Sequence, residues 1–101
     1  MKAEEVIREI RTQIKAIETY GYDKQTIVAI EELSELTKEL TKALRGELNR
    51  EHLAEELADV DLMYTQIMFM YGVEYKDIDA HKKKKIDRLA KMLEELEESD
   101  G

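Results

Sequence analysis

The absence of proline is the feature that most limits the folds open to this chain. None of its 101 residues is proline, and only four are glycine. These two residue types are the strongest interrupters of long helices, because proline removes a backbone donor and glycine is costly to order. We therefore predict an all-α protein in which the glycines mark the ends of the helices.

Three internal glycines divide the chain into four helical stretches. The predicted helices cover about residues 3–18, a second stretch from a capping Asp23 to Arg45, a third from a capping Asn49 to Gly72, and about 74–98, with an acidic tail from about residue 94. Apolar residues recur in each at intervals of three and four. The predicted apolar stripes are Val6, Ile7, Ile10, Ile14 and Ile17; Val28, Leu33, Leu36, Leu40 and Leu44; Leu53, Leu57, Val60, Tyr64, Ile67 and Tyr71; and Ile78, Ile86, Leu89, Met92, Leu93 and Leu96.

Short connections between successive helices favour antiparallel neighbours. The sequence therefore predicts one domain over residues 1–101, a four-helix up-and-down bundle. A chain of this length builds only a modest core, and a partner subunit would cover more of its apolar surface. We accordingly expect a homodimer or a homotetramer.

The charge balance excludes two classes of partner. Sixteen basic and 24 acidic residues give a net charge of −8, whereas nucleic-acid polymers and anionic membranes are bound by basic surfaces. A hydrophobic content of 43% indicates a folded chain, yet no apolar run approaches the roughly 20 residues that span a bilayer. With no cysteine and no apolar N-terminal signal stretch, a cytoplasmic protein is expected.

Two predicted helices each carry a pair of acidic residues three positions apart. Glu32 and Glu35 belong to the second helix, and Glu56 and Asp59 to the third. Residues at this spacing lie about 60° apart around a helix, so the two carboxylates of a pair can converge. Two such helices packed antiparallel would direct four carboxylates into one space, where their mutual repulsion requires protons or cations.

The position of these acids favours a cation site over an ordinary solvated surface. Glu32 and Glu56 project onto the edges of the apolar faces of their helices. Neither they nor Asp59 has a lysine or arginine three or four residues away, although Glu35 has Lys38. Acids on an exposed face commonly have such partners.

Oxygen ligands without imidazole or thiolate favour Mg²⁺, with Mn²⁺ as a possible substitute. Di-iron bundles use a Glu-x-x-His motif, and neither histidine of this chain is part of one. His52 is interpreted as a capping or pairing residue. Four carboxylates carry too much charge for one divalent ion, so they imply several ions or a metal that arrives with an anionic ligand such as a polyphosphate.

The segment Glu31-Glu32-Leu33-Ser34-Glu35 followed by Glu56-Leu57-Ala58-Asp59 resembles the all-α nucleoside triphosphate pyrophosphohydrolases, the MazG-like superfamily, in its small phage and bacterial members. Further similar segments are residues 25–42, Arg45-Gly46, residues 55–67, and Lys85 with Arg88. The resemblance implies that Glu32, Glu35, Glu56 and Asp59 bind magnesium. It also implies hydrolysis of a nucleoside triphosphate, with a deoxynucleotide favoured, to the monophosphate and pyrophosphate. Dimers or tetramers are the assemblies it implies.

Other residues receive roles in this hypothesis. Glu31 or Glu35 is the candidate general base for water, and the sequence does not choose between them. Gln25, seven residues before Glu32 on the same helical face, is a candidate for orienting substrate or water, or else an ordinary polar residue of the first turn. The candidates for binding phosphate are Lys82, Lys85 and Arg88, which recur at intervals of three.

Two positions depart from the family pattern. His81 stands in a region where members often have a small polar residue, and Asp61 stands where they usually have an apolar one. We interpret Asp61 as structural. Among the aromatic residues, Tyr64 and Tyr71 are expected to pack in the core, whereas the tyrosines on either side of Gly21 are freer to meet a ligand.

Two alternative functions stay open at the level of sequence. One is hydrolysis of a phosphoribosyl nucleotide of the phosphoribosyl-ATP type, which differs from the favoured reaction in substrate alone. The other is a non-catalytic helical interaction protein whose acidic residues only keep it in solution.

Overall fold

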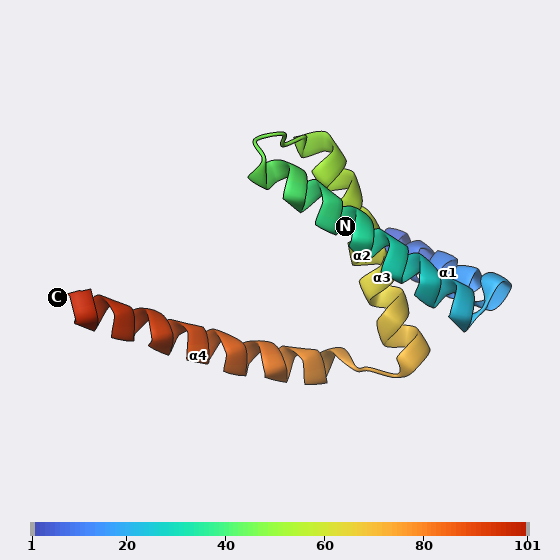
Figure 1. Ribbon diagram of the computed structural model, residues 1–101. Helices are drawn as coiled ribbons and strands as arrows, with labels where there is room; N and C mark the ends of the chain where they lie inside the picture. Colours follow the sequence, from blue (N-terminus) through green and yellow to red (C-terminus); the bar gives the residue numbers. More distant parts are fainter. Residues whose placement is uncertain (1, 101) are drawn as a thin grey trace. The chain divides into compact units, whose positions relative to one another are not determined.

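The computed structural model describes residues 2–100, and within this range it contains four α-helices and no strand (Figure 1). The helices are α1 (Ala3–Tyr20), α2 (Tyr22–Leu44), α3 (Arg50–Tyr71) and α4 (Tyr75–Asp100). The predicted all-α class is therefore confirmed. No described helix is both long enough and apolar enough to cross a membrane.

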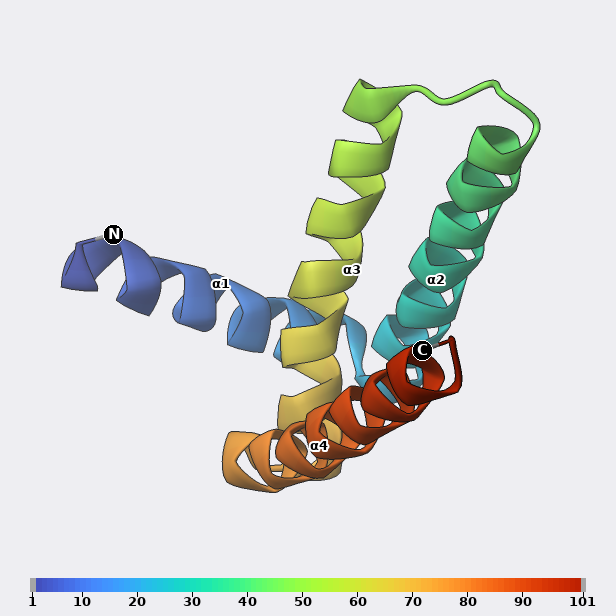
Figure 2. The ribbon, with the colours of Figure 1, turned by 90° about the vertical axis from the view of Figure 1, so that its left-hand side faces the viewer.

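The chain forms two compact units. The first ends at Tyr71 and contains α1, α2 and α3, and the second begins at Gly72 and contains α4 alone. Within the first, α2 and α3 lie side by side and run in opposite directions, and α1 crosses near the end of the pair opposite the connecting loop (Figure 2). The four-helix bundle and its oligomer remain predictions.

Glycines end the helices as predicted, and the loop between α2 and α3 shows how. Gly46 has a φ of 78°, a conformation that glycine adopts without strain. Its N–H donates to the carbonyl of Ala43 at 3.0 Å, and the N–H of Glu47 donates to that of Lys42 at 2.9 Å. These bonds satisfy carbonyls that the end of a helix leaves without partners. Asn49 then caps α3, because its Oδ1 accepts the backbone N–H of His52 at 3.1 Å.

Two helix boundaries differ from the prediction. Gly21 occupies the N-cap position of α2, so the helix begins at Tyr22 and Asp23 lies in its first turn instead of capping it. An acidic residue there still interacts favourably with the helix dipole. The last helix was predicted to end near residue 98, in the acidic tail, but α4 remains helical through Asp100. Leucine and glutamate have high helix propensity, which favours continuation.

The core of the first unit is small and partly polar. Its buried apolar residues are Ile17, Ala29, Met63 and Met70, and its buried polar residues are Gln25, Glu39 and Gln66. The stripe predicted for α2 is partly wrong, because Leu33 is 48% and Leu40 50% exposed. The face of α2 that meets α3 is instead the one that carries Gln25 and Glu39, and this rotation moves the leucines outward.

Candidate metal centre

Carboxylates from two helices converge in the first unit. One carboxylate oxygen from each of Glu32, Glu56 and Asp59 lies within 4.8 Å of the other two. Glu32 comes from α2, whereas Glu56 and Asp59 lie three residues apart on α3, so that one turn presents both. Three of the four predicted metal ligands are therefore brought together. We call these three residues the acidic cluster.

The acidic cluster is partly removed from solvent. Glu32 and Glu56 are half-buried, and the Oε2 atom of Glu56 is buried with no hydrogen-bond partner among the described residues. A buried carboxylate oxygen without a donor is costly, since its lost hydration is not replaced. A cation would supply the missing interaction, and the donor set of the cluster fits a hard divalent ion because all its ligand atoms are carboxylate oxygens.

The pKa of Glu32 is raised within the acidic cluster. Burial, followed by the negative charges and hydrogen-bonding of Asp59 and Glu56, raises the pKa of Glu32 from 4.5 to about 7. A proton on Glu32 relieves the repulsion that three nearby carboxylates create. A divalent ion relieves the same repulsion, so protons and metal compete for this site.

The fourth predicted ligand, Glu35, is engaged elsewhere. Its Oε1 atom accepts a hydrogen bond from Lys38 Nζ at 3.0 Å, and both side chains are largely exposed. Glu35 thus forms the local ion pair that its spacing from Lys38 indicated. Glu31, the other candidate base, is exposed on α2. The three residues of the acidic cluster carry the converging charge without either of these two.

Gln25 lies in the interface between α2 and α3. Its Nε2 donates to Gln66 Oε1 at 2.8 Å, and both residues are 6% exposed. Gln25 is therefore more than a polar residue of the first turn. Gln66 was missed in the sequence, although a signal was present: it lies seven residues after Asp59, as Gln25 lies seven before Glu32, and a spacing of seven keeps a residue on the same helical face.

A cavity of about 570 Å³ opens between α1 and α3 within the first unit. Gln66 lines it from α3 together with Leu62, and Thr12 and Gln13 line it from α1. The Oε1 atom of Gln13 is buried without a hydrogen-bond partner among the described residues. The volume lies within the usual range for small-molecule sites, which is about 300–1,000 Å³.

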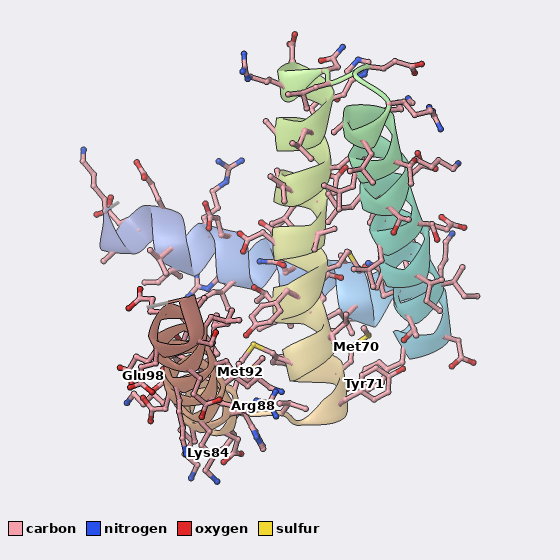
Figure 3. All side chains as sticks on the ribbon, turned by 60° about the vertical axis from the view of Figure 1, so that its left-hand side comes forward. Met70, Tyr71, Lys84, Arg88, Met92 and Glu98 are labelled. Atoms are coloured by element: carbon pink, nitrogen blue, oxygen red, sulfur yellow. The ribbon has the colours of Figure 1, made fainter. Side chains whose placement is uncertain are left out.

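The predicted phosphate-binding residues all belong to the second unit. They are exposed on α4, where Lys85 and Arg88 flank a shallow hollow with His81 and Lys84. Figure 3 shows Lys84 and Arg88 projecting outward from the helix. The concentration of basic residues on this helix, Lys82 included, is as the sequence indicated, and their binding of phosphate stays a prediction.

Two of the five tyrosines of the chain link the end of α3 to the start of α2. The rings of Tyr22 and Tyr71 meet edge to face with centroids 6.4 Å apart, and the Tyr71 hydroxyl lies 2.6 Å from Thr26 Oγ1. Tyr22 is nevertheless 48% exposed. Tyr20 is 56% exposed and has Lys24 Nζ 5.0 Å from its ring centroid. Tyr64 and Tyr71 were expected in the core, but they are 42% and 56% exposed, so this prediction is wrong.

Asp61, for which a structural role was predicted, is exposed on α3. Its backbone carbonyl accepts a hydrogen bond from Thr65 Oγ1 at 3.4 Å.

Comparison with protein-family models, with curated proteins and with solved structures gave no match to this chain.

Proposed function

We propose that this protein hydrolyses a nucleoside triphosphate, with a deoxynucleotide favoured, to the monophosphate and pyrophosphate, with Mg²⁺ as cofactor and Mn²⁺ as a possible substitute. The observation that carries the proposal is the convergence of Glu32, Glu56 and Asp59 within 4.8 Å. Mg²⁺ is bound in proteins by one or two carboxylates together with substrate phosphates. A cluster with excess negative charge suits a ligand that arrives with its own metal.

The bound metal would neutralise phosphate charge and lower the pKa of a coordinated water. In the reaction, the water oxygen bonds to phosphorus, the bond from that phosphorus to the pyrophosphate oxygen breaks, and a carboxylate takes the water proton. Glu31 is the more available base, since it is exposed and Glu35 holds Lys38 at 3.0 Å. No cysteine is present to serve as a competing nucleophile.

The nucleoside part of the substrate has a candidate place in the first unit. The cavity between α1 and α3 is of suitable size, and Gln66 lines it while bonding to Gln25. The spacing of seven residues from Asp59 to Gln66 corresponds to about 10 Å along α3. Gln25 would then act on the substrate indirectly, by fixing the orientation of the Gln66 amide.

Pyrophosphate release is the direct test. The protein is incubated with Mg²⁺ and a panel of ribo- and deoxyribonucleoside triphosphates, and a phosphoribosyl nucleotide is included for the alternative substrate class. We expect Glu56→Gln and Asp59→Asn to lower kcat roughly 100-fold or more, because metal ions contribute several kcal/mol to such reactions. Glu55→Gln, an exposed neighbour on α3, serves as the matched control and should retain activity. Absence of pyrophosphate from every nucleotide would overturn the proposal.

A non-catalytic interaction protein is the competing function, and the exposed apolar residues of α1 and α4 favour it. Val6, Ile7 and Ile10 on α1 are 40–48% exposed. The two functions differ in their response to magnesium. A metal site stabilises the folded protein by mass action when the ion binds, whereas a solvated acidic surface responds little. An Mg²⁺-dependent rise in Tm that Asp59→Asn abolishes would support the metal site.

A further inference from the structure

The apolar stripe of α4 is exposed, and neither the candidate metal centre nor the proposed reaction uses it. α4 is one continuous helix from Tyr75 to Asp100 (Figure 1). Its stripe consists of residues that alternate at spacings of three and four and are each at least half exposed, namely Ile86, Leu89, Leu93 and Leu96. Residues in this pattern are buried when two helices pair side by side. The stripe therefore suits a second helix as its partner.

Charge is unevenly distributed along the same helix. Residues 82–91 contain six basic side chains and one acidic one, whereas residues 94–98 contain four glutamates and no basic residue. We call these two stretches the basic segment and the acidic segment. All of their side chains are exposed. The stripe is therefore flanked by positive charge toward its start and by negative charge toward its end.

These charges decide between the two ways in which copies of α4 can pair. In a parallel pair, the two basic segments lie beside each other, and so do the two acidic segments, so like charges repel along the contact. In an antiparallel pair, each basic segment lies beside the acidic segment of the other copy. The helix is thus complementary to itself in the antiparallel orientation, as an interface with two-fold symmetry requires.

The stripe sets the register of the antiparallel pair. With a two-fold axis at the level of residue 91, Ile86 of one copy lies opposite Leu96 of the other, and Leu89 lies opposite Leu93. Every residue of the stripe then meets an apolar residue. Residues 84–88 and 94–98 are equally far from this axis, so the same register also aligns opposite charges.

One contact of this register joins the edges of the stripe. Lys83 and Glu97 lie on the same side of the stripe, and the register brings Lys83 of one copy within one residue of the level of Glu97 of the other. Within its own helix, Lys83 Nζ holds Asp79 at 3.0 Å, an ion pair of the surface kind that contributes little stability. Lys83 can therefore exchange this partner for Glu97 of a second copy at little cost.

We infer that α4 is an interface between two copies of this chain, and that the two helices pair antiparallel about residue 91. The partner is a second copy because α4 supplies both the stripe and the two opposite charges that the contact needs. The interface belongs to the second unit and does not depend on the acidic cluster. Failure of the proposed hydrolysis would therefore leave it standing, and its own failure would leave the hydrolysis proposal intact.

Cysteine pairing tests both the partner and the orientation, because the chain has no cysteine of its own. Leu89→Cys and Leu93→Cys are prepared as separate full chains, one with a mass tag, then mixed and equilibrated in glutathione buffer. We expect disulfide-linked dimers to join the two variants well above their statistical share, since the register places residue 89 opposite residue 93. Each variant alone should link poorly. The control mixture of Lys91→Cys with Leu93→Cys should give no excess, because residue 91 lies on the far side of α4.

Two results of this experiment would overturn the inference. In a parallel pair, residue 89 lies opposite its own counterpart, so Leu89→Cys alone would give the most linked dimer. The absence of linked dimers from every mixture, together with a monomeric mass of the unaltered chain in sedimentation equilibrium, would show that α4 is not an interface between copies.

A charge reversal tests the orientation while leaving the stripe intact. Glu97→Lys places a lysine beside the basic segment of the other copy, and the contact occurs twice in a symmetric pair, so the dissociation constant of the dimer should rise about tenfold. Glu98→Lys makes the same change of charge on the far side of α4 and should have a much smaller effect. Sedimentation equilibrium measures both constants. A dissociation constant that Glu97→Lys leaves unchanged or lowers would contradict antiparallel pairing.

Discussion

Glu32 lies near two carboxylates of the opposite helix, and its raised pKa makes the stability of the metal-free protein depend on pH. An acid whose pKa rises from 4.5 to about 7 on folding stabilises the fold fully below pH 4.5. That contribution is lost as pH rises through about 7, where the folded protein must release the proton. The neutral isostere Glu32→Gln avoids this loss.

In EDTA, Glu32→Gln should therefore gain stability over the unaltered protein as pH increases from 5 to 8. We expect a gain on the order of 1 kcal/mol, a value reduced for solvent screening at this half-buried site, measured by urea unfolding at each pH. The exposed neighbour provides the control, since Glu31→Gln should show no such trend. A stability difference for Glu32→Gln that is the same at pH 5 and pH 8 would contradict the assignment.

The same titration governs metal binding. Mg²⁺ must displace the proton from Glu32, so the rise in Tm on adding Mg²⁺ should be larger at pH 8 than at pH 6. In Glu32→Gln the Mg²⁺ effect should be smaller and nearly independent of pH. Thermal melts at fixed Mg²⁺ concentration measure both, and a larger Mg²⁺ effect at pH 6 would be the opposite of what this site requires.

At the scale of the elements, the Gln25–Gln66 hydrogen bond holds α2 against α3. Gln25→Leu leaves the side-chain carbonyl oxygen of Gln66, Oε1, buried without its donor. We expect a loss of about 1–3 kcal/mol in the free energy of unfolding. The double variant Gln25→Leu/Gln66→Leu removes both partners and should recover most of that loss. Urea unfolding of the two single variants and the double variant gives the coupling energy.

The hydrogen bond between Thr26 and Tyr71, at the end of the same helix pair, provides a comparison. Thr26→Val removes the contact of Thr26 with the Tyr71 hydroxyl, which is exposed, and should cost less than Gln25→Leu because water replaces the lost partner. Additive effects of the two glutamine substitutions would show that the buried amide bond does not couple the helices.

The end of α2 and the start of α3 were predicted correctly because those signals are local. Gly46 and Asn49 act through hydrogen bonds to residues three to five positions away, so a short segment contains the whole cause. The acidic pair of α3 was predictable for the same reason. Glu56 and Asp59 are three residues apart, and any helix places them on one side.

The face of α2 that packs against α3 could not be predicted from the residues of α2 alone. The leucines mark the most apolar face, yet the face that meets α3 carries Gln25, which bonds to Gln66, and Glu32, which meets Asp59. These contacts depend on residues of another helix. The role of Glu35 could not be predicted from the residues of α2 either. Its spacing equally permits a metal site and an ion pair with Lys38, and the structure has the ion pair at 3.0 Å.

At the scale of the whole molecule, α4 has an exposed apolar stripe that a partner would cover. Its stripe of Ile86, Leu89, Leu93 and Leu96 is 50–62% exposed, and the helix forms a unit by itself. Helices in proteins gain most of their stability by packing an apolar face. A second copy of the chain would offer an identical stripe, and residues spaced alternately three and four apart suit helix pairing. This supports the proposed oligomer.

A single charge in that stripe tests the proposed assembly. Leu93→Glu would place a carboxylate in the apolar contact between copies, so the molar mass measured by sedimentation equilibrium should fall from a multiple of 11.8 kDa to that of one chain. Lys91→Glu alters charge more strongly but lies on the opposite side of α4, and it should leave the mass unchanged. If Leu93→Glu instead lowers the Tm while the mass stays constant, the stripe packs within its own chain, and the proposed assembly through α4 is wrong.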